Sequence, residues 1–236
     1  RVQTGKRLLS KHAELLADVS ETHGIQPRFI VALWGLESDF GANSGEFPTI
    51  ASLATLAQGG RRGGYFRREL MAALKLVDRG EARAETMYGS WAGAMGQCQF
   101  MPSNFLRHAV DQDGDGVRDI WSNPADVMAS IAKLTSLFDW HDDQTRGREV
   151  ALPDGFDRRL LGDEVRLRLN RLQALGVRRA DGRNLPTRNL WSMMLRPDGT
   201  SGRAFVVYDN FHSLLRWNRS NHFAIAVGHL ADRLIQ

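Results

Sequence analysis

The sequence has 236 residues, of which 42% are apolar and 25% charged; this excludes a disordered, collagen-like or fibrous chain. The single cysteine, Cys98, excludes an intrachain disulfide, and no apolar run approaches the ~18 residues that span a bilayer. The net charge of +4 comes from the C-terminal part. Residues 1–140 hold 15 of the 31 Lys and Arg and 16 of the 27 Asp and Glu, so residues 141–236 hold 16 Lys and Arg against 11 Asp and Glu. Either this part binds a polyanion, such as nucleic acid or an acidic cell-wall polymer, or its arginines form a solvated face.

Helical patterns fill residues 5–140. Apolar residues at helical spacing predict a first helix that stops at Gly24, and Pro27 opens a second that continues to about Phe40. Further helices are predicted at 48–57, 65–79 and 124–139, the last with Asn123 as N-cap.

The periodicity changes between residues 187 and 208. Two apolar runs, 190–195 and 204–208, flank Pro197-Asp198-Gly199 and predict a short antiparallel hairpin, after which helices resume at about 210. The sequence therefore predicts a mainly α (α+β) protein. Its parts are a helical lobe (1–140), a smaller lobe with the hairpin (141–210) and C-terminal helices (211–236) that return to the helical lobe and line a cleft.

Glu37 is the first candidate catalytic residue. It follows Ile30, Leu33 and Trp34 at helical spacing, which places its carboxylate on an apolar helix face. Desolvation and the negative end of the helix dipole both disfavour a charged carboxylate, so its pKa is expected to rise toward that of a general acid. The alternative is a carboxylate paired with an arginine or turned outward at a frayed helix end.

A second segment, Ser90 to Ser103, is rich in glycine, alanine, amides and aromatic residues. Small residues permit close approach of a substrate, with Gln99 as a hydrogen-bond donor and Phe100 as a stacking face. The alternative is a tightly packed core helix.

The acidic run 111–119 has the rhythm of an EF-hand loop. Asp111, Asp113 and Asp115 take positions 1, 3 and 5, a glycine follows at position 6, and Val117 offers its carbonyl at position 7. At position 12, where a bidentate glutamate is usual, the sequence has Ser122. The alternative is a turn of acids neutralised by solvent or sodium.

Together these segments resemble the peptidoglycan lytic transglycosylases of the membrane-bound B type and their soluble relatives. That family carries a Trp-Gly helix ending in the catalytic glutamate, a glycine four residues later, and a segment S-[FW]-A-G-A-M-G-x-x-Q-F-M-P-S, and both occur here in order. The resemblance extends to Arg61-Arg62 with Tyr65-Phe66, to the acidic loop and to residues 216–221, and so covers nearly the whole chain.

The resemblance implies a lysozyme-like catalytic domain with an EF-hand-like loop and Glu37 as its single acid and base. It implies that Ser90 orients Glu37 and that Gln99 and Phe100 bind sugar. The residues implied to line the site from the C-terminal side are Trp217, Asn218 and Phe223.

Three further implications of the resemblance concern individual positions. Arg61 and Arg62 match a pair that meets the peptide stem, although a solvated loop is the alternative. A longer calcium loop is closed by an aspartate of the following helix, with Asp126 as the candidate and Asp119 as the lesser one. Leu134 stands where relatives commonly have a tyrosine, so one wall of the site is expected to differ.

The resulting functional prediction is non-hydrolytic cleavage of the β-1,4 bond between N-acetylmuramic acid and N-acetylglucosamine, leaving 1,6-anhydromuramic ends. A hydrolytic muramidase and a non-catalytic cell-wall-binding or calcium-binding module are the alternatives.

The expected ligands are structural Ca²⁺ and peptidoglycan strands, with other cell-wall enzymes as possible partners, no organic cofactor and no nucleic acid. The sequence has no HExxH, GxSxG or phosphate-loop motif. A start at Arg1 rather than Met is interpreted as a trimmed form, and the resemblance implies the bacterial periplasm or the periplasmic face of the outer membrane.

Overall fold

The computed structural model describes the whole chain apart from the side chain of Asp163. It divides into two compact units, Arg1–Leu137 with His229–Gln236, and Phe138–Gly228. The predicted boundary near residue 140 lies close to this division, whereas the predicted C-terminal segment 211–236 contributes residues to both units. Within the described residues, no helix is long and apolar enough to span a membrane.

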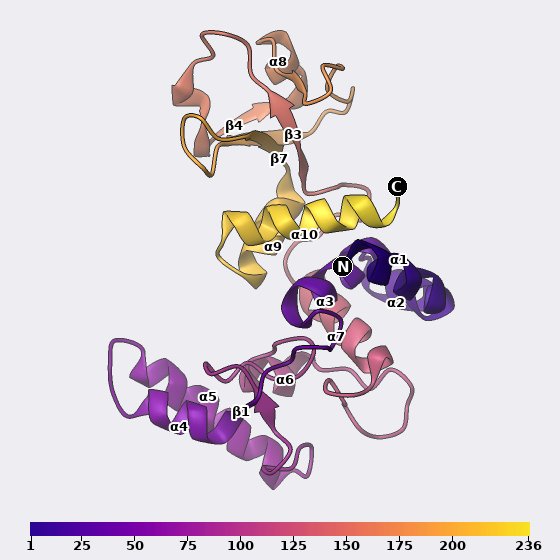
Figure 1. Cartoon of the computed structure of the whole chain (residues 1–236), viewed down its shortest axis with the longest axis vertical. Helices are drawn as coiled ribbons and strands as arrows, with labels where there is room; N and C mark the ends of the chain where they lie inside the picture. The colour runs from indigo at the N-terminus through magenta and orange to yellow at the C-terminus, as the bar shows by residue number, and fades with distance from the viewer. The chain divides into compact units, whose positions relative to one another are not determined.

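The first unit is helical (Figure 1). Its only two strands among the described residues, β1 (Phe47–Pro48) and β2 (Tyr88–Gly89), pair antiparallel. Its helices are α1 (Val2–Lys11), α2 (Ala13–His23), α3 (Pro27–Ser38), α4 (Thr49–Ala57), α5 (Gly63–Asp78), α6 (Pro102–His108) and α7 (Pro124–Ser136), with the end of α10 (Asn221–Leu234).

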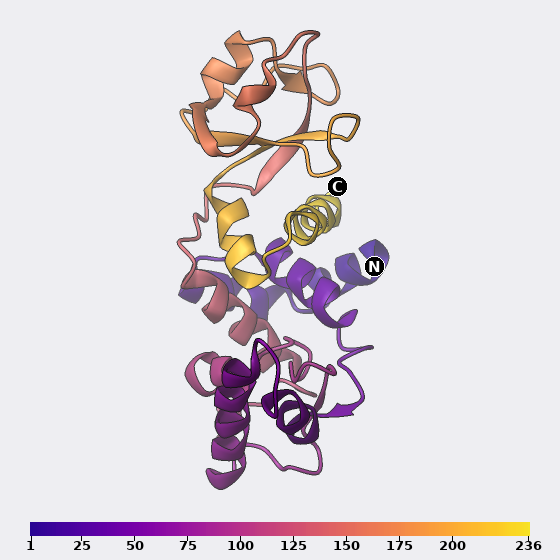
Figure 2. The ribbon, with the colours of Figure 1, turned by 90° about the vertical axis from the view of Figure 1, so that its left-hand side faces the viewer.

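The predicted N-terminal helix is two helices. His12 leaves the helical region, with φ −111° and ψ 27°, and it ends α1 and caps α2. The other helix predictions for this unit are confirmed within a few residues. Asn123 caps α7 as predicted, because its side chain accepts a hydrogen bond from the Ala125 N–H at 2.9 Å. Helices α4 and α5 lie side by side, as the purple pair in Figure 2 shows.

Helix α3 is the central helix of this unit. Pro27 occupies its first turn, and every residue from Phe29 to Gly35 is buried, so α3 has apolar neighbours on all sides. The chain then reverses through Asp39 and Phe40, whose φ angles are 52° and 60°. The Phe40 ring returns across Gly35, where a Cβ would lie 2.6 Å from Phe40 Cζ, and it meets Trp34 edge-on at 5.9 Å.

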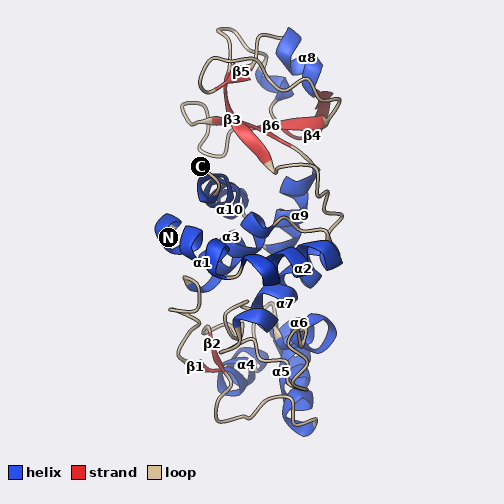
Figure 3. Cartoon of the chain, turned by 90° about the vertical axis from the view of Figure 1, so that its right-hand side faces the viewer, coloured by secondary structure: helices blue, strands red, loops and turns tan.

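The second unit contains a five-stranded antiparallel sheet in the order β4-β6-β7-β3-β5 (Figure 3). Its elements are β3 (Gly147–Ala151), β4 (Gly162–Arg168), α8 (Leu169–Ala174), β5 (Arg178–Arg179), β6 (Trp191–Leu195), β7 (Ala204–Val207), α9 (Asp209–Trp217) and the start of α10. The predicted hairpin is confirmed as β6 and β7, with Met194 opposite Val206. Three further strands, which are not predicted from the sequence, complete the sheet around this hairpin. The predicted class, mainly α with a small antiparallel sheet, is confirmed.

Candidate active site

Glu37 lies in the last turn of α3 and is half-buried. The helix end beneath it is held by specific bonds rather than frayed. Ser38 Oγ donates to the Trp34 carbonyl at 3.4 Å and accepts the Gly41 N–H at 3.0 Å, and the Ser38 carbonyl accepts the Asn43 N–H at 2.8 Å. This geometry argues against a frayed helix end at Glu37.

Gln97 joins α3 to the Ser90–Ser103 segment, and the sequence did not single it out. Its Oε1 accepts the Trp34 Nε1–H at 2.8 Å, and its Nε2 donates to the Trp121 carbonyl at 2.7 Å. Gly41 packs against the same amide, because a Cβ there would lie 2.3 Å from Gln97 Oε1, and its φ is 89°. The glycine four residues after Glu37 is therefore required by a close approach and by a left-handed backbone.

The Ser90–Ser103 segment is not a core helix up to Met101. Ser90 N–H donates to the Ala94 carbonyl at 2.8 Å, and Ser90 Oγ accepts the Ala94 N–H at 3.1 Å. Met95 and Phe100 exchange backbone hydrogen bonds at 2.8 and 3.0 Å. The segment is thus a compact double turn that places half-buried Ser90 and Gln99 side chains in a fixed frame.

Gln99 holds a neighbouring loop in place. It adopts φ 51°, which is unusual for a residue with a side chain, and its Nε2 donates to the Ser44 and Gly96 carbonyls, both at 2.9 Å. Since Ser44 follows the turn after Glu37, Gln99 fixes the chain that leaves α3. Sugar binding by Gln99 stays a prediction.

Phe100 is only 1% exposed, so its ring packs in the core and offers no stacking face to a sugar. The stacking role expected for Phe100 is therefore corrected to a packing role. Leu134, on α7, is also buried. The side chain that lacks the tyrosine hydroxyl of the relatives is thus a buried one.

Cys98 lies in this segment, and the charge of Glu37 acts on its thiol. Burial raises the pKa of the Cys98 thiol well above its usual value, and the negative charges of Glu37 and Asp126 raise it further. Its Sγ lies 3.5 Å from the Val127 carbonyl, in hydrogen-bond contact. The thiol therefore stays protonated and takes no part as a nucleophile.

Three residues predicted to line the site belong to the second unit. Trp217 ends α9 and is half-buried, Asn218 caps the helix and is exposed, and half-buried Phe223 donates its N–H to Ser220 Oγ at 3.2 Å. The three residues are thus close in sequence around one helix connection. Their approach to Glu37 stays a prediction.

Arg61 and Arg62 are exposed in the connection between α4 and α5. The Arg62 guanidinium lies 4.9 Å from the Tyr65 ring centroid and 5.4 Å from that of Phe66. Such stacking orients a guanidinium and leaves its edge free for a carboxylate. Contact with a peptide stem stays a prediction.

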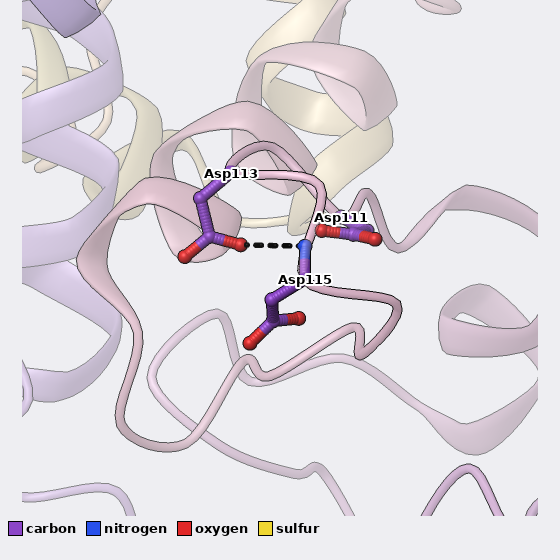
Figure 4. Close-up of side chains that lie close together, drawn as sticks. All are labelled: Asp111, Asp113 and Asp115. Atoms are coloured by element: carbon purple, nitrogen blue, oxygen red, sulfur yellow. Dashed lines mark hydrogen bonds between the residues drawn. The ribbon is translucent and has the colours of Figure 1, made fainter.

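The acidic loop brings three carboxylates together (Figure 4). One oxygen from each of Asp111, Asp113 and Asp115 lies within 4.8 Å of the others. Asp111 also accepts the backbone N–H groups of Gly114 and Gly116 at 2.8 and 2.9 Å, so the loop is wound around its first residue. This donor set fits a hard cation such as Ca²⁺, with the Val117 carbonyl as a further oxygen.

Asp126 is fully buried and is not one of these three residues. Its two oxygens accept the N–H groups of Gln112 and Asp119, each at 2.7 Å, and thereby clamp both ends of the loop. Burial raises the pKa of Asp126, and the two hydrogen bonds counteract this rise. Asp119 accepts the N–H groups of Trp121 and Ser122 at 2.8 and 2.9 Å and is hydrogen-bonded to the Ser122 hydroxyl. Both acids thus shape the loop, and ion binding by Asp126 stays a prediction.

The mainly helical fold, with a half-buried carboxylate at the end of its buried helix α3, is that of a lysozyme-like domain. Comparison with solved structures supports this class. A crystal structure of SltB3 from Pseudomonas aeruginosa in complex with NAG-anhNAM-pentapeptide matches with a TM-score of 0.95 and 42% identity, over 100% of this chain and 63% of that one. Escherichia coli lytic transglycosylase Slt35 in complex with calcium matches with a TM-score of 0.85 and 28% identity, over 99% and 74% of the two chains.

Sequence comparison specifies the family. The model of the transglycosylase SLT domain matches residues 1–232, so this chain belongs to that family. Membrane-bound lytic murein transglycosylase B of Escherichia coli K12 is 30% identical over 98% of this chain, which spans 63% of that protein's length. The predicted resemblance to lytic transglycosylases of the B type is confirmed.

Proposed function

We propose that this chain cleaves the β-1,4 bond between N-acetylmuramic acid and N-acetylglucosamine in peptidoglycan without adding water, leaving 1,6-anhydromuramic ends. The observation that carries the proposal is Glu37, a half-buried carboxylate at the fixed end of the buried helix α3. Family membership supports the reaction class. The relative bound to NAG-anhNAM-pentapeptide supports the substrate class.

Glu37 acts first as an acid and then as a base. It donates its proton to the oxygen that leaves as the C4 hydroxyl of N-acetylglucosamine, while the C1–O bond breaks and the substrate's N-acetyl oxygen stabilises the positive charge at C1. The Glu37 carboxylate then takes the proton of the muramic C6 hydroxyl as the C6 oxygen bonds to C1. One proton leaves Glu37 and one returns, so no water is consumed.

The nearest acid in sequence does not provide a second catalytic carboxylate. Asp39 lies two residues beyond Glu37, where the chain has left the helix, and its Oδ1 accepts a hydrogen bond from Arg1 Nε at 2.8 Å. Glycosidases that admit water usually need two carboxylates about 5–9.5 Å apart. No sequence motif supplies another partner for Glu37, and this favours the non-hydrolytic reaction over a muramidase.

The remaining predicted roles form part of the proposal. Ser90 orients Glu37. Gln99 fixes the neighbouring loop and contacts the sugar. Trp217, Asn218 and Phe223 line the glycan site, and Arg61 and Arg62 meet carboxylates of the peptide stem. Ca²⁺ held by Asp111, Asp113, Asp115 and the Val117 carbonyl stabilises the acidic loop, with Asp126 shaping it. The calcium-bound relative supports this assignment, and the membrane-bound murein enzyme supports a periplasmic location.

The test is mass spectrometry of peptidoglycan digested in H₂¹⁸O. The expected main product is a 1,6-anhydromuramic end, lighter by one water than a reducing end and free of label. Reducing muramic ends that carry ¹⁸O would show a muramidase, and an absence of new ends would show a binding module. Glu37→Gln should abolish the product, whereas Asp39→Asn, a matched change two residues away, should retain it.

A further inference from the structure

The sheet of the second unit carries a cavity of about 550 Å³ that none of the proposed roles uses. Its lining residues belong to β4, β6 and α8, which Figure 3 labels. Three of its lining residues are arginines, Arg166 and Arg168 from β4 and Arg171 from α8, and a fourth is Trp191 from β6. We call this site the arginine–tryptophan cavity.

The strand register brings the charged groups onto one indole. Arg166 and Arg168 are two residues apart on β4 and therefore share a face of the sheet. Arg168 pairs directly with Trp191 across the strands. The Arg168 guanidinium lies 4.0 Å from the Trp191 ring centroid and that of Arg166 lies 5.9 Å from it. Stacking on an aromatic face orients a guanidinium while its N–H edge stays open to an acceptor.

The cavity has an excess of positive charge. Arg166 forms an ion pair with Asp209 at 2.7 Å, and Arg168 donates to the Asn189 carbonyl at 3.1 Å. Arg171 is exposed and forms no ion pair with any described side chain. The described residues that line the cavity thus include three arginines and no acid, whereas Glu164 of the same strand lies outside the lining. This excess belongs to the basic C-terminal part of the sequence, where 16 Lys and Arg stand against 11 Asp and Glu.

The chemistry of the lining selects the kind of anion. Guanidinium edges match the paired oxygens of a carboxylate, and the indole and Ala174 provide apolar surface for an attached aliphatic chain. A small peptide with free carboxylates has both features, whereas an inorganic anion has only the charge. Trp191 is still 42% exposed, so its ring can be reached from solvent.

We propose that the arginine–tryptophan cavity binds the carboxylate-bearing peptide stem of peptidoglycan, as a second contact apart from Arg61 and Arg62. The identity of the ligand as a stem peptide rests on the proposed function. Recognition of a carboxylate on an aliphatic chain rests on the cavity alone. The second unit thereby holds the peptides of the polymer whose glycan strand is cleaved.

The test is NMR titration of the full ¹⁵N-labelled chain with a synthetic, sugar-free stem pentapeptide. The Trp191 indole N–H signal, assigned by its loss in Trp191→Phe, reports on this cavity separately from any other binding site. We expect this signal to shift with the free-acid peptide and not with the same peptide carrying amidated carboxylates. Arg168→Gln and Arg171→Gln should each weaken this binding about tenfold, as expected for a lost charge-assisted contact. Arg158→Gln, which removes an exposed arginine of the same unit outside the cavity, should leave it unchanged.

Several results would overturn the inference. They are an unshifted Trp191 signal, equal affinity for the amidated peptide, an equal loss in Arg158→Gln, or tighter binding of inorganic phosphate than of the peptide. Cleavage of peptide-free glycan strands is measured in parallel and should not change in Arg168→Gln or Arg171→Gln. A wild-type chain that produces no anhydromuramic ends but shifts its Trp191 signal would refute the proposed function and retain the carboxylate site.

Discussion

Replacing Gln97 by leucine tests whether this amide holds the end of α3 against the following segment. Leucine has a similar size but leaves the Trp34 N–H and the Trp121 carbonyl without the partners that they have at 2.8 and 2.7 Å. Each polar group left unsatisfied in a buried site costs about 1–3 kcal/mol. The two together should therefore lower the free energy of unfolding by about 2–6 kcal/mol. For a chain of this size a loss of 1 kcal/mol lowers Tm by about 2–4 °C, so Gln97→Leu should melt at least ~4 °C lower.

The assay is thermal unfolding followed by circular dichroism, with cleavage activity measured well below Tm. Gln58→Leu is the control, because Gln58 is exposed at the end of α4 and its change should shift Tm by less than ~1 °C. Gln97→Leu should lower kcat by a larger factor than it raises KM, since Gln97 contacts the helix that carries Glu37. A Tm for Gln97→Leu equal to that of Gln58→Leu would refute the reasoning.

Three further predictions concern the same unit. Glu37→Gln should keep the parental Tm and lower turnover by at least ~10²–10⁴-fold in the peptidoglycan assay; parental turnover would contradict the assignment. Calcium at ~100 times its Kd should add about 2.7 kcal/mol of stability, seen as a higher Tm than in chelator at matched ionic strength. Asp115→Ala should abolish this rise in Tm, whereas Asp78→Ala, which changes an exposed acid outside the loop, should leave it unchanged. A rise in Tm that survives Asp115→Ala would show that calcium does not bind in this loop. Gly41→Ala should destabilise the chain more than Gly60→Ala by calorimetry, because both have positive φ but only Gly41 would clash with another residue; equal losses would show that backbone strain alone acts.

The features that the sequence predicts well depend on local signals. Pro27 and Asn123 mark helix starts because each acts on the backbone within a turn, and the spacing of Asp111, Asp113 and Asp115 specifies a loop within a few residues. The sequence predicts the hairpin β6–β7 for the same reason, since its two apolar strands and its turn are contiguous. Helical spacing from Trp34 predicts that Glu37 lies near the end of a helix, as it does in α3.

The missed features depend on pairing between distant segments. Strand β3 has apolar side chains only at Val150 and Ala151 and does not read as a strand in isolation. Strand β4 alternates Val165 and Leu167 with charged residues, which is a strand pattern, although no strand is predicted there. Their backbone groups are satisfied by β6 and β7, which come 25 to 60 residues later in the register pairs Leu167–Ser192 and Gly147–Val207. Gln97 was missed similarly, because Trp34 lies 63 residues away from it.

An aromatic side chain next to a predicted site residue gives no signal of which way it faces. Phe100 follows Gln99 in the segment and has the residue type of a sugar platform, yet it is a core residue. Aromatic side chains bury large apolar areas, so core packing is their commonest use, and the direction of Phe100 is set by the double turn in which its N–H and carbonyl bond to Met95. Sequence patterns of this kind predict which segment forms the site better than they predict which side chain touches the ligand.

The charge of Glu37, the proposed catalytic carboxylate, acts on the buried thiol of Cys98. A Coulomb interaction acts equally on both partners, so the charge that raises the pKa of the Cys98 thiol keeps that side of Glu37 free of a thiolate. A protonated, fully buried thiol contributes apolar surface and no charge. Cys98 therefore acts as packing in this segment and supplies no anion to the proposed reaction.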